Sequence, residues 1–114
     1  MMSDDLPILQ KIYELYKAFY QCSSNLPKKD RFGIGQRCEN LILDVIEQTI
    51  KASKSRRENK LAVLYQISLQ LDTLKIFIRL MKEIRAIDLK KYTLFQGYIN
   101  EIGKMLGGWI KSIN

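Results

Sequence analysis

Residues 6–24 read LPILQKIYELYKAFYQCSS and carry the pattern that decides the fold. Four large apolar side chains recur there at spacings of three, four and three residues: Leu9, Ile12, Tyr16 and Phe19. Because an α-helix completes a turn in about 3.6 residues, these side chains share one face. Pro7 stands in the expected first turn, where a missing N–H has no helical partner. The stretch predicts an amphipathic helix that ends before residues 25–27.

The same periodicity predicts three further helices in the rest of the chain. The second runs from about Lys28 to Ala52, with one side formed by Cys38, Leu41, Val45, Ile46 and Thr49. The third begins near Ser55, because Ser55-Arg56-Arg57-Glu58 has the form of a capping box, and it reaches about Ala86. Asp88 is the expected N-cap of a fourth helix that extends almost to Asn114.

The predicted fold is all-α. Two prolines and six glycines are too few for a protein built from many short strands and tight turns. Short linkers place successive helices next to each other and in opposite directions. We therefore expect one domain over residues 1–114, an antiparallel up-down-up-down four-helix bundle.

Several classes of function lack their usual residues in this chain. Histidine is absent, which removes the commonest general base and zinc ligand. Cys22 and Cys38 are separated by sixteen positions with no CxxC motif, so we interpret them as buried, reduced thiols. No phosphate-binding glycine loop or nucleophile elbow occurs. The sequence predicts no enzyme, no catalytic residue, no metal site and no cofactor.

The location of the protein is expected from its ends and its apolar runs. The N-terminus MMSDDLPILQ is acidic and lacks the basic-then-apolar order of a signal peptide. No uninterrupted apolar run approaches the roughly 18 residues that cross a bilayer. We expect a cytoplasmic protein with no membrane partner.

The charge favours an anionic partner. Nineteen Lys and Arg against twelve Asp and Glu give a net charge of +7. On a helical wheel that turns about 100° per residue, Arg79 and Lys82 fall within about 40° of Lys75, and Arg85 lies beside this stripe. The stripe is the predicted nucleic-acid-binding site: Lys75, Arg79, Lys82 and Arg85. Two other basic clusters, in residues 28–37 and 51–60, are typical of solvent-exposed helix ends.

The third helix has more apolar surface than one bundle requires. Leu74, Phe77, Ile78 and Met81 flank the basic stripe on one side, and Ile76, Leu80 and Ile87 on the other. A bundle helix needs an apolar arc of only about 100° or slightly more. The pattern fits either a deeply buried helix with a thin solvated edge or a helix with two interfaces, one of them to another copy. We favour the homo-oligomer.

The C-terminal segment IGKMLGGWIKSIN places three glycines inside a predicted helix. Each glycine costs a helix interior about 1 kcal/mol relative to alanine, so a compensating role is expected. Gly103 and Gly107 are four residues apart and leave a groove for the close approach of another helix. The predicted helix-packing and oligomer residues are Gly103, Gly107, Gly108 and Trp109, with Phe77 as a candidate neighbour.

Three segments carry a resemblance to a known family: LPKKDRFGIGQRCENLILDVIE (26–47), LDTLKIFIRLMKEIRAI (71–87) and EIGKMLGGWIKSIN (101–114). The chain resembles bacterial four-helix bundle proteins, and among them the accessory variability determinant (Avd) proteins of diversity-generating retroelements. The most specific part is the C-terminal Gly-[KR]-x-Leu-Gly-x-Trp-Ile segment. With the apolar spacing of the first helix, the resemblance covers nearly the whole chain.

The resemblance implies a homopentamer of four-helix protomers that forms a positively charged barrel. It also implies two partners, the reverse transcriptase of the retroelement and RNA or DNA, and a role in mutagenic cDNA synthesis without a catalytic site. Lys75 and Arg79, with Lys82 and Arg85, would contact phosphates and would not read bases. Two alternatives remain: a four-helix bundle protein of the 23S rRNA intervening-sequence type, and a structural protein-binding oligomer whose basic charge is incidental.

Overall fold

The computed structural model describes residues 6–113. In that range the chain forms α1 (Pro7–Ser23), α2 (Lys28–Arg31), α3 (Ile34–Lys54), α4 (Arg57–Glu83) and α5 (Leu89–Ile113). No strand occurs between residues 6 and 113, so the predicted all-α fold is confirmed. The acidic residues of the N-terminus and Asn114, which entered the predictions of location and of one domain over 1–114, lie outside the described residues.

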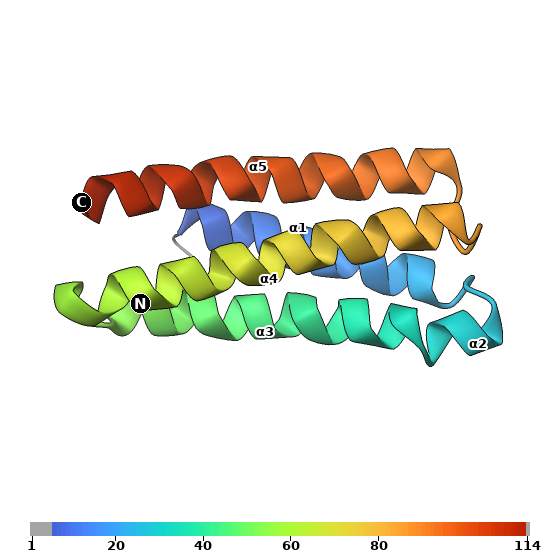
Figure 1. The fold of residues 1–114 in the computed structure, drawn as a ribbon, viewed down its shortest axis with the longest axis horizontal. Helices are drawn as coiled ribbons and strands as arrows, with labels where there is room; N and C mark the ends of the chain where they lie inside the picture. Colours follow the sequence, from blue (N-terminus) through green and yellow to red (C-terminus); the bar gives the residue numbers. More distant parts are fainter. Residues whose placement is uncertain (1–5, 114) are drawn as a thin grey trace.

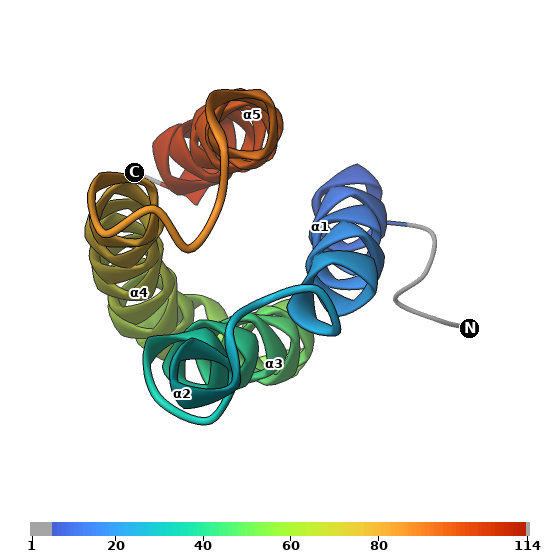
Figure 2. The same cartoon turned by 90° about the vertical axis from the view of Figure 1, so that its right-hand side faces the viewer.

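The four long helices lie side by side, and the turns between them lie at alternating ends of the molecule (Figure 1). Helices α1 and α4 each contact both α3 and α5. The end-on view shows the resulting ring of four helices, with α2 at the end of α3 that faces the viewer (Figure 2). The bundle measures 43 × 24 × 20 Å.

The core is formed by large side chains from every long helix. The predicted stripe of α1 is buried at Leu9, Ile12 and Phe19, whereas Tyr16 is half-buried and donates a hydrogen bond to Glu39 Oε2 at 3.1 Å. The largest fully buried side chains are Phe19, Phe95, Ile12, Leu15, Ile42, Leu64, Ile67, Leu74, Ile78, Met81, Ile102 and Val45. Burial of these side chains is the main source of stability in such a bundle.

The two thiols are free and buried, as predicted. Cys38 Sγ lies 3.7 Å from Met81 Sδ, and burial raises the pKa of the Cys38 thiol to about 12. Burial also raises the pKa of Cys22. Both side chains therefore stay neutral near pH 7 and contribute to packing.

The predicted helix over residues 28–52 is wrong near its beginning. The chain leaves the helical conformation at Phe32 and Gly33, which separate α2 from α3. A Cβ at Gly33 would lie 2.9 Å from Lys29 O, and one at Gly35 would lie 2.8 Å from both Asp30 O and Leu26 Cδ1. The two glycines therefore allow α2 to fold closely over the start of α3, which apolar periodicity alone did not predict.

The predicted capping box at Ser55 is also wrong. Ser55 ends α3, and its hydroxyl donates a hydrogen bond to Lys51 O at 2.7 Å. Arg56 takes the N-cap position of α4 and makes no side-chain cap hydrogen bond within the described chain. The serine hydroxyl instead satisfies a carbonyl in the last turn of the preceding helix.

Helix α4 ends at Glu83, three residues before the predicted end. Ala86 N donates to Met81 O at 2.8 Å and Arg85 N donates to Lys82 O at 3.0 Å, the hydrogen bonds of a Schellman motif. Arg85 has a φ of 66° and occupies the left-handed position that glycine usually takes. The predicted N-cap of α5 is confirmed, because Lys91 N donates to Asp88 Oδ1 at 2.8 Å.

By length and composition alone, α4 is apolar enough to cross a membrane, and 28% of its most apolar 18-residue window is buried. Polar residues are interspersed along α4, so it contains no uninterrupted apolar run of that length. One such helix is weak evidence for a membrane span, since a core helix of a soluble protein passes the same test.

Candidate nucleic-acid interface

Three of the four predicted cations lie along the edge of α4 that faces α5. We call this set, Lys75, Arg79 and Lys82, the basic edge. Lys75 and Arg79 are exposed, whereas Lys82 is half-buried, with its Nζ 4.3 Å from the centre of the Tyr92 ring. Their spacings of four and three residues keep them on one side of the helix. The structure therefore brings these three residues together.

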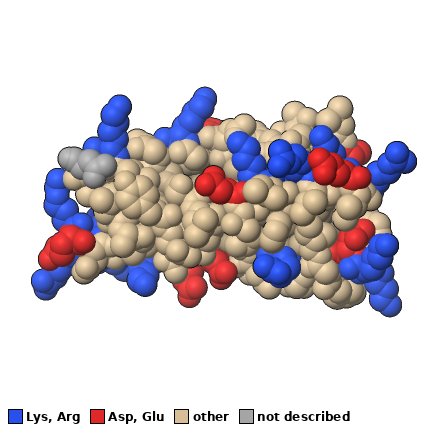
Figure 3. Space-filling view, viewed as in Figure 1, with Lys and Arg blue, Asp and Glu red and all other residues tan. Residues whose placement is uncertain are grey.

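Helix α5 supports the basic edge from one side. Lys75, Ile76 and Arg79 line a small hollow of about 100 Å³ together with Tyr92 and Gln96 of α5. Gln96 Nε2 donates a hydrogen bond to Lys75 O at 3.3 Å. In Figure 3, Lys and Arg side chains gather where α4 and α5 approach their shared turn, with acidic side chains beside them. The basic edge therefore contacts α5, while the side chains of Lys75 and Arg79 remain exposed.

Arg85 is placed differently from the other three cations. Because α4 ends at Glu83, Arg85 belongs to the turn and does not follow the angular positions of the helical wheel. Its predicted position beside the stripe assumed a helix to Ala86, which the structure does not form, and its contact with nucleic acid stays a prediction. A helix end closed by backbone hydrogen bonds at a left-handed Arg85 is not visible in the periodicity of the sequence.

Large apolar side chains remain exposed along the outer side of α4. We call Tyr65, Leu69, Ile76 and Leu80 the apolar stripe. These side chains are 53%, 59%, 51% and 40% exposed, and their spacings of four, seven and four residues place them on one face. The opposite side of α4 contributes Leu74, Ile78 and Met81 to the core. The excess apolar surface predicted for this helix is therefore on the outside of the bundle.

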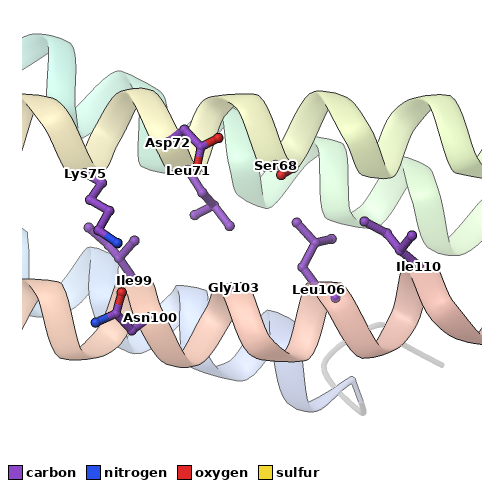
Figure 4. Close-up of a pocket in the computed structure, with 10 residues that line it drawn as sticks. Ser68, Leu71, Asp72, Lys75, Ile99, Asn100, Gly103, Leu106 and Ile110 are labelled. Atoms are coloured by element: carbon purple, nitrogen blue, oxygen red, sulfur yellow. The ribbon is translucent and has the colours of Figure 1, made fainter.

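The predicted glycine groove lies between α4 and α5. Ser68, Leu71, Asp72 and Lys75 face Ile99, Asn100, Gly103, Leu106 and Ile110 across it, and it encloses about 170 Å³ with Gly107 (Figure 4). Beyond the adjoining backbone of α5 itself, a Cβ at Gly103, Gly107 or Gly108 would meet no described atom within 4 Å. Packing inside the protomer therefore does not require these glycines, and their use against another copy stays a prediction.

The large side chains near the glycines have other neighbours. Trp109 is half-buried and packs against the core. Phe77, the predicted neighbour of the glycines, instead lies beside Arg37, whose Cζ is 5.4 Å from the ring centre. Phe77 and Arg37 line a second hollow with Phe32, at the start of α3. The interpretation of residues 28–37 as solvent-exposed helix ends did not predict this hollow. The signal in the sequence was Phe32, a large aromatic residue within a basic segment.

The described part of the chain contains no cluster of side chains that could bind a metal ion. Between residues 6 and 113, no group of three or more Cys, Asp or Glu side chains is arranged to hold a metal ion.

A family model described as bAvd-like matches residues 6–113. The chain belongs to the bAvd-like family. The match spans all four long helices and the connections between them, so it does not depend on the C-terminal motif alone. No curated protein matches the chain. Membership in the bAvd-like family confirms the resemblance to Avd proteins.

Proposed function

We propose that this protein is the accessory subunit of a diversity-generating retroelement. In this proposal it is a non-catalytic, cytoplasmic homo-oligomer that binds the reverse transcriptase and RNA or DNA and supports mutagenic cDNA synthesis. The observation that carries the proposal is the bAvd-like match over residues 6–113. The same match favours the retroelement over the 23S rRNA intervening-sequence alternative.

The basic edge supports the nucleic-acid part of the proposal. Lys75 and Arg79 are exposed, and neither forms an ion pair with a described residue. Lys75 and Lys82 are separated by seven positions, which corresponds to roughly 10 Å along the helix axis. Cations at this spacing are suited to contacting phosphates of one strand, which would position the strand without reading its sequence.

The apolar stripe supports self-association. It lies on α4 beside the basic edge, and exposed apolar surface of this kind is typical of protein interfaces. We propose that the stripe packs against another copy, in a pentamer as the family resemblance implies. Repetition of the basic edge around a ring would convert a weak phosphate site into a multivalent one.

The basic edge is tested by the double substitution Lys75→Ala with Arg79→Ala. Loss of two phosphate contacts should weaken binding of RNA or DNA by about tenfold at physiological salt. It should also reduce the slope of log K against log salt by about 1.5. Fluorescence anisotropy over a salt series measures both quantities, and light scattering checks that the oligomeric mass is unchanged.

A matched control removes two positive charges elsewhere. Lys17→Ala with Lys104→Ala changes the net charge equally, at exposed positions of α1 and α5. This control should retain most of the affinity. Equal losses in the two double variants would show a general charge effect and would remove Lys75 and Arg79 from the site. Absence of salt-sensitive binding by the unaltered protein would favour the protein-binding oligomer with incidental charge.

Self-association is tested by Leu69→Glu with Ile76→Glu. Both side chains are exposed, so the protomer should fold, but two carboxylates buried at an interface would cost several kcal/mol. We expect the mass measured by light scattering to fall to that of a monomer while the helical circular dichroism remains.

The matched variant for this test is Tyr13→Glu with Tyr20→Glu, which changes two exposed apolar residues of α1. It should retain the oligomeric mass. Loss of mass in the α1 variant but not in the α4 variant would place the interface on α1 and contradict the proposal. Co-purification with the reverse transcriptase of a diversity-generating retroelement tests the second partner.

A further inference from the structure

The corner between α2 and α3 exposes an aromatic ring at the edge of a hollow. Phe32 is 66% exposed, among the most exposed of the large apolar side chains. It lines an open hollow of about 510 Å³ together with Gly33, Ile34, Gln36, Arg37 and Phe77. The hollow combines the start of α3 with Phe77, in the C-terminal part of α4. It is separate from the basic edge, which faces α5.

The corner is held by backbone contacts. Gly33 N donates to Asp30 O at 3.3 Å, and Arg31 donates from a terminal guanidinium nitrogen to Ser24 O at 3.1 Å. The close approaches at Gly33 and Gly35 leave no room for a Cβ. The exposure of Phe32 is therefore a consequence of a packed backbone and not of a loose loop.

One cation lies over the exposed ring, and three others belong to the same segment of chain. Arg31 Cζ lies 5.8 Å from the centre of the Phe32 ring, and Arg37 Cζ lies 5.4 Å from that of Phe77. Lys28 and Lys29 are exposed in the preceding turn. Residues 28–37 thus contain four cations and one carboxylate, that of Asp30. The corner offers flat apolar surface and positive charge to the same ligand.

This combination matches the chemistry of an unpaired nucleotide. A base has a flat face that stacks on an aromatic ring, and its phosphate is attracted to Lys and Arg. A purely apolar partner in the hollow would have to desolvate Arg31 and Arg37 without compensation. A paired duplex would keep its base faces inside the stack and could not use the Phe32 ring.

We propose that the α2–α3 corner binds single-stranded nucleic acid. One base stacks on Phe32 in the hollow toward Phe77, while Arg37 and the lysines of α2 contact the adjacent phosphates. The site goes beyond the basic edge, and it rests on the proposed function only in that its ligand is a nucleic acid.

The test compares Phe32→Leu with the unaltered protein on a fluorescein-labelled oligouridylate. Leucine retains apolar bulk but has no aromatic face, and base–aromatic stacking contributes enough that binding should weaken by about fivefold to a hundredfold. Phe32→Trp should restore the affinity. The salt slope should stay unchanged in both variants, because no charge is removed.

Two further ligands separate stacking from other effects. An abasic strand with the same number of phosphates, and a duplex of the same length, should bind Phe32→Leu and the unaltered protein equally. Tyr13→Leu is the matched control, since Tyr13 is 54% exposed and has Lys17 Nζ 5.0 Å from its ring centre. This variant should bind the oligouridylate normally.

The outcomes distinguish this proposal from the proposed function. Salt-sensitive binding with equal affinities for Phe32→Leu and the unaltered protein would overturn the stacking site alone. An equal loss on the abasic strand would also overturn it. A fall in oligomeric mass in Phe32→Leu would assign the ring to an interface between copies. If the unaltered protein bound none of the three ligands, both proposals would be overturned.

Discussion

Replacing Phe19 with alanine should lower the free energy of unfolding by about 3–5 kcal/mol. Phe19 is fully buried on α1, and its ring centre lies 5.5 Å from that of Phe95 on α5. Truncation removes the transfer free energy of the ring, leaves a cavity in a closely packed interior and ends the aromatic contact. Urea unfolding followed by circular dichroism measures the change, at one protein concentration because the proposed self-association would contribute to stability.

The control for this prediction is another phenylalanine of the same chain. Phe32 is 66% exposed, so Phe32→Ala should change the free energy of unfolding by no more than about 0.5 kcal/mol. If Phe19→Ala lowered the free energy of unfolding by less than about 1 kcal/mol, or by as much as Phe32→Ala does, Phe19 would not be part of a packed core between α1 and α5.

The long helices were predictable because their signal is local. Apolar residues that recur every three or four positions must share a face, whatever the rest of the chain does, and Ile12 and Phe19 are buried for this reason. The cap at Asp88 was also local, since the side chain reaches a backbone N–H only three residues away. The family followed from short motifs distributed along the chain, and the bAvd-like match over residues 6–113 confirmed it.

The errors arose at helix ends, where more than one local hydrogen-bond arrangement is open to the chain. Ser55 has two possible hydrogen-bond partners, and the structure uses Lys51 O in α3 and not the backbone of α4. The end of α4 depends on the Schellman hydrogen bonds that close at Arg85, a residue with no glycine-like signal in the sequence. Such choices are made by hydrogen bonds at the helix ends, which the spacing of apolar residues does not encode.

The candidate site was predictable to the same extent. A helical wheel placed Lys75, Arg79 and Lys82 together because all three lie inside one helix. It could not place Arg85, which follows the helix end, and it gave no reason to select Phe32. The exposure of Phe32 depends on the angle at which α2 joins α3. That angle depends on Gly33 and Gly35, which lie close to backbone atoms of α2.

The glycines give the last prediction, in which the same substitution has opposite effects at two positions. Gly35→Ala should lower the free energy of unfolding by about 1–3 kcal/mol, because the new Cβ would lie 2.8 Å from Asp30 O and from Leu26 Cδ1. Asp30 O is a backbone atom, so α2 itself would have to move. Gly103→Ala should raise the same free energy by about 1 kcal/mol, since alanine is the better helix former and its Cβ has open space.

Urea unfolding of both variants at one protein concentration measures the two changes, and light scattering reports the oligomeric mass. Destabilisation by Gly103→Ala with unchanged mass would show a contact inside the protomer and contradict the open groove between α4 and α5. Stabilisation with a reduced mass would instead support close approach of another copy to the bare backbone at Gly103. Tolerance of Gly35→Ala would mean that α2 shifts at little cost, and the packed corner that exposes Phe32 would lose its structural basis.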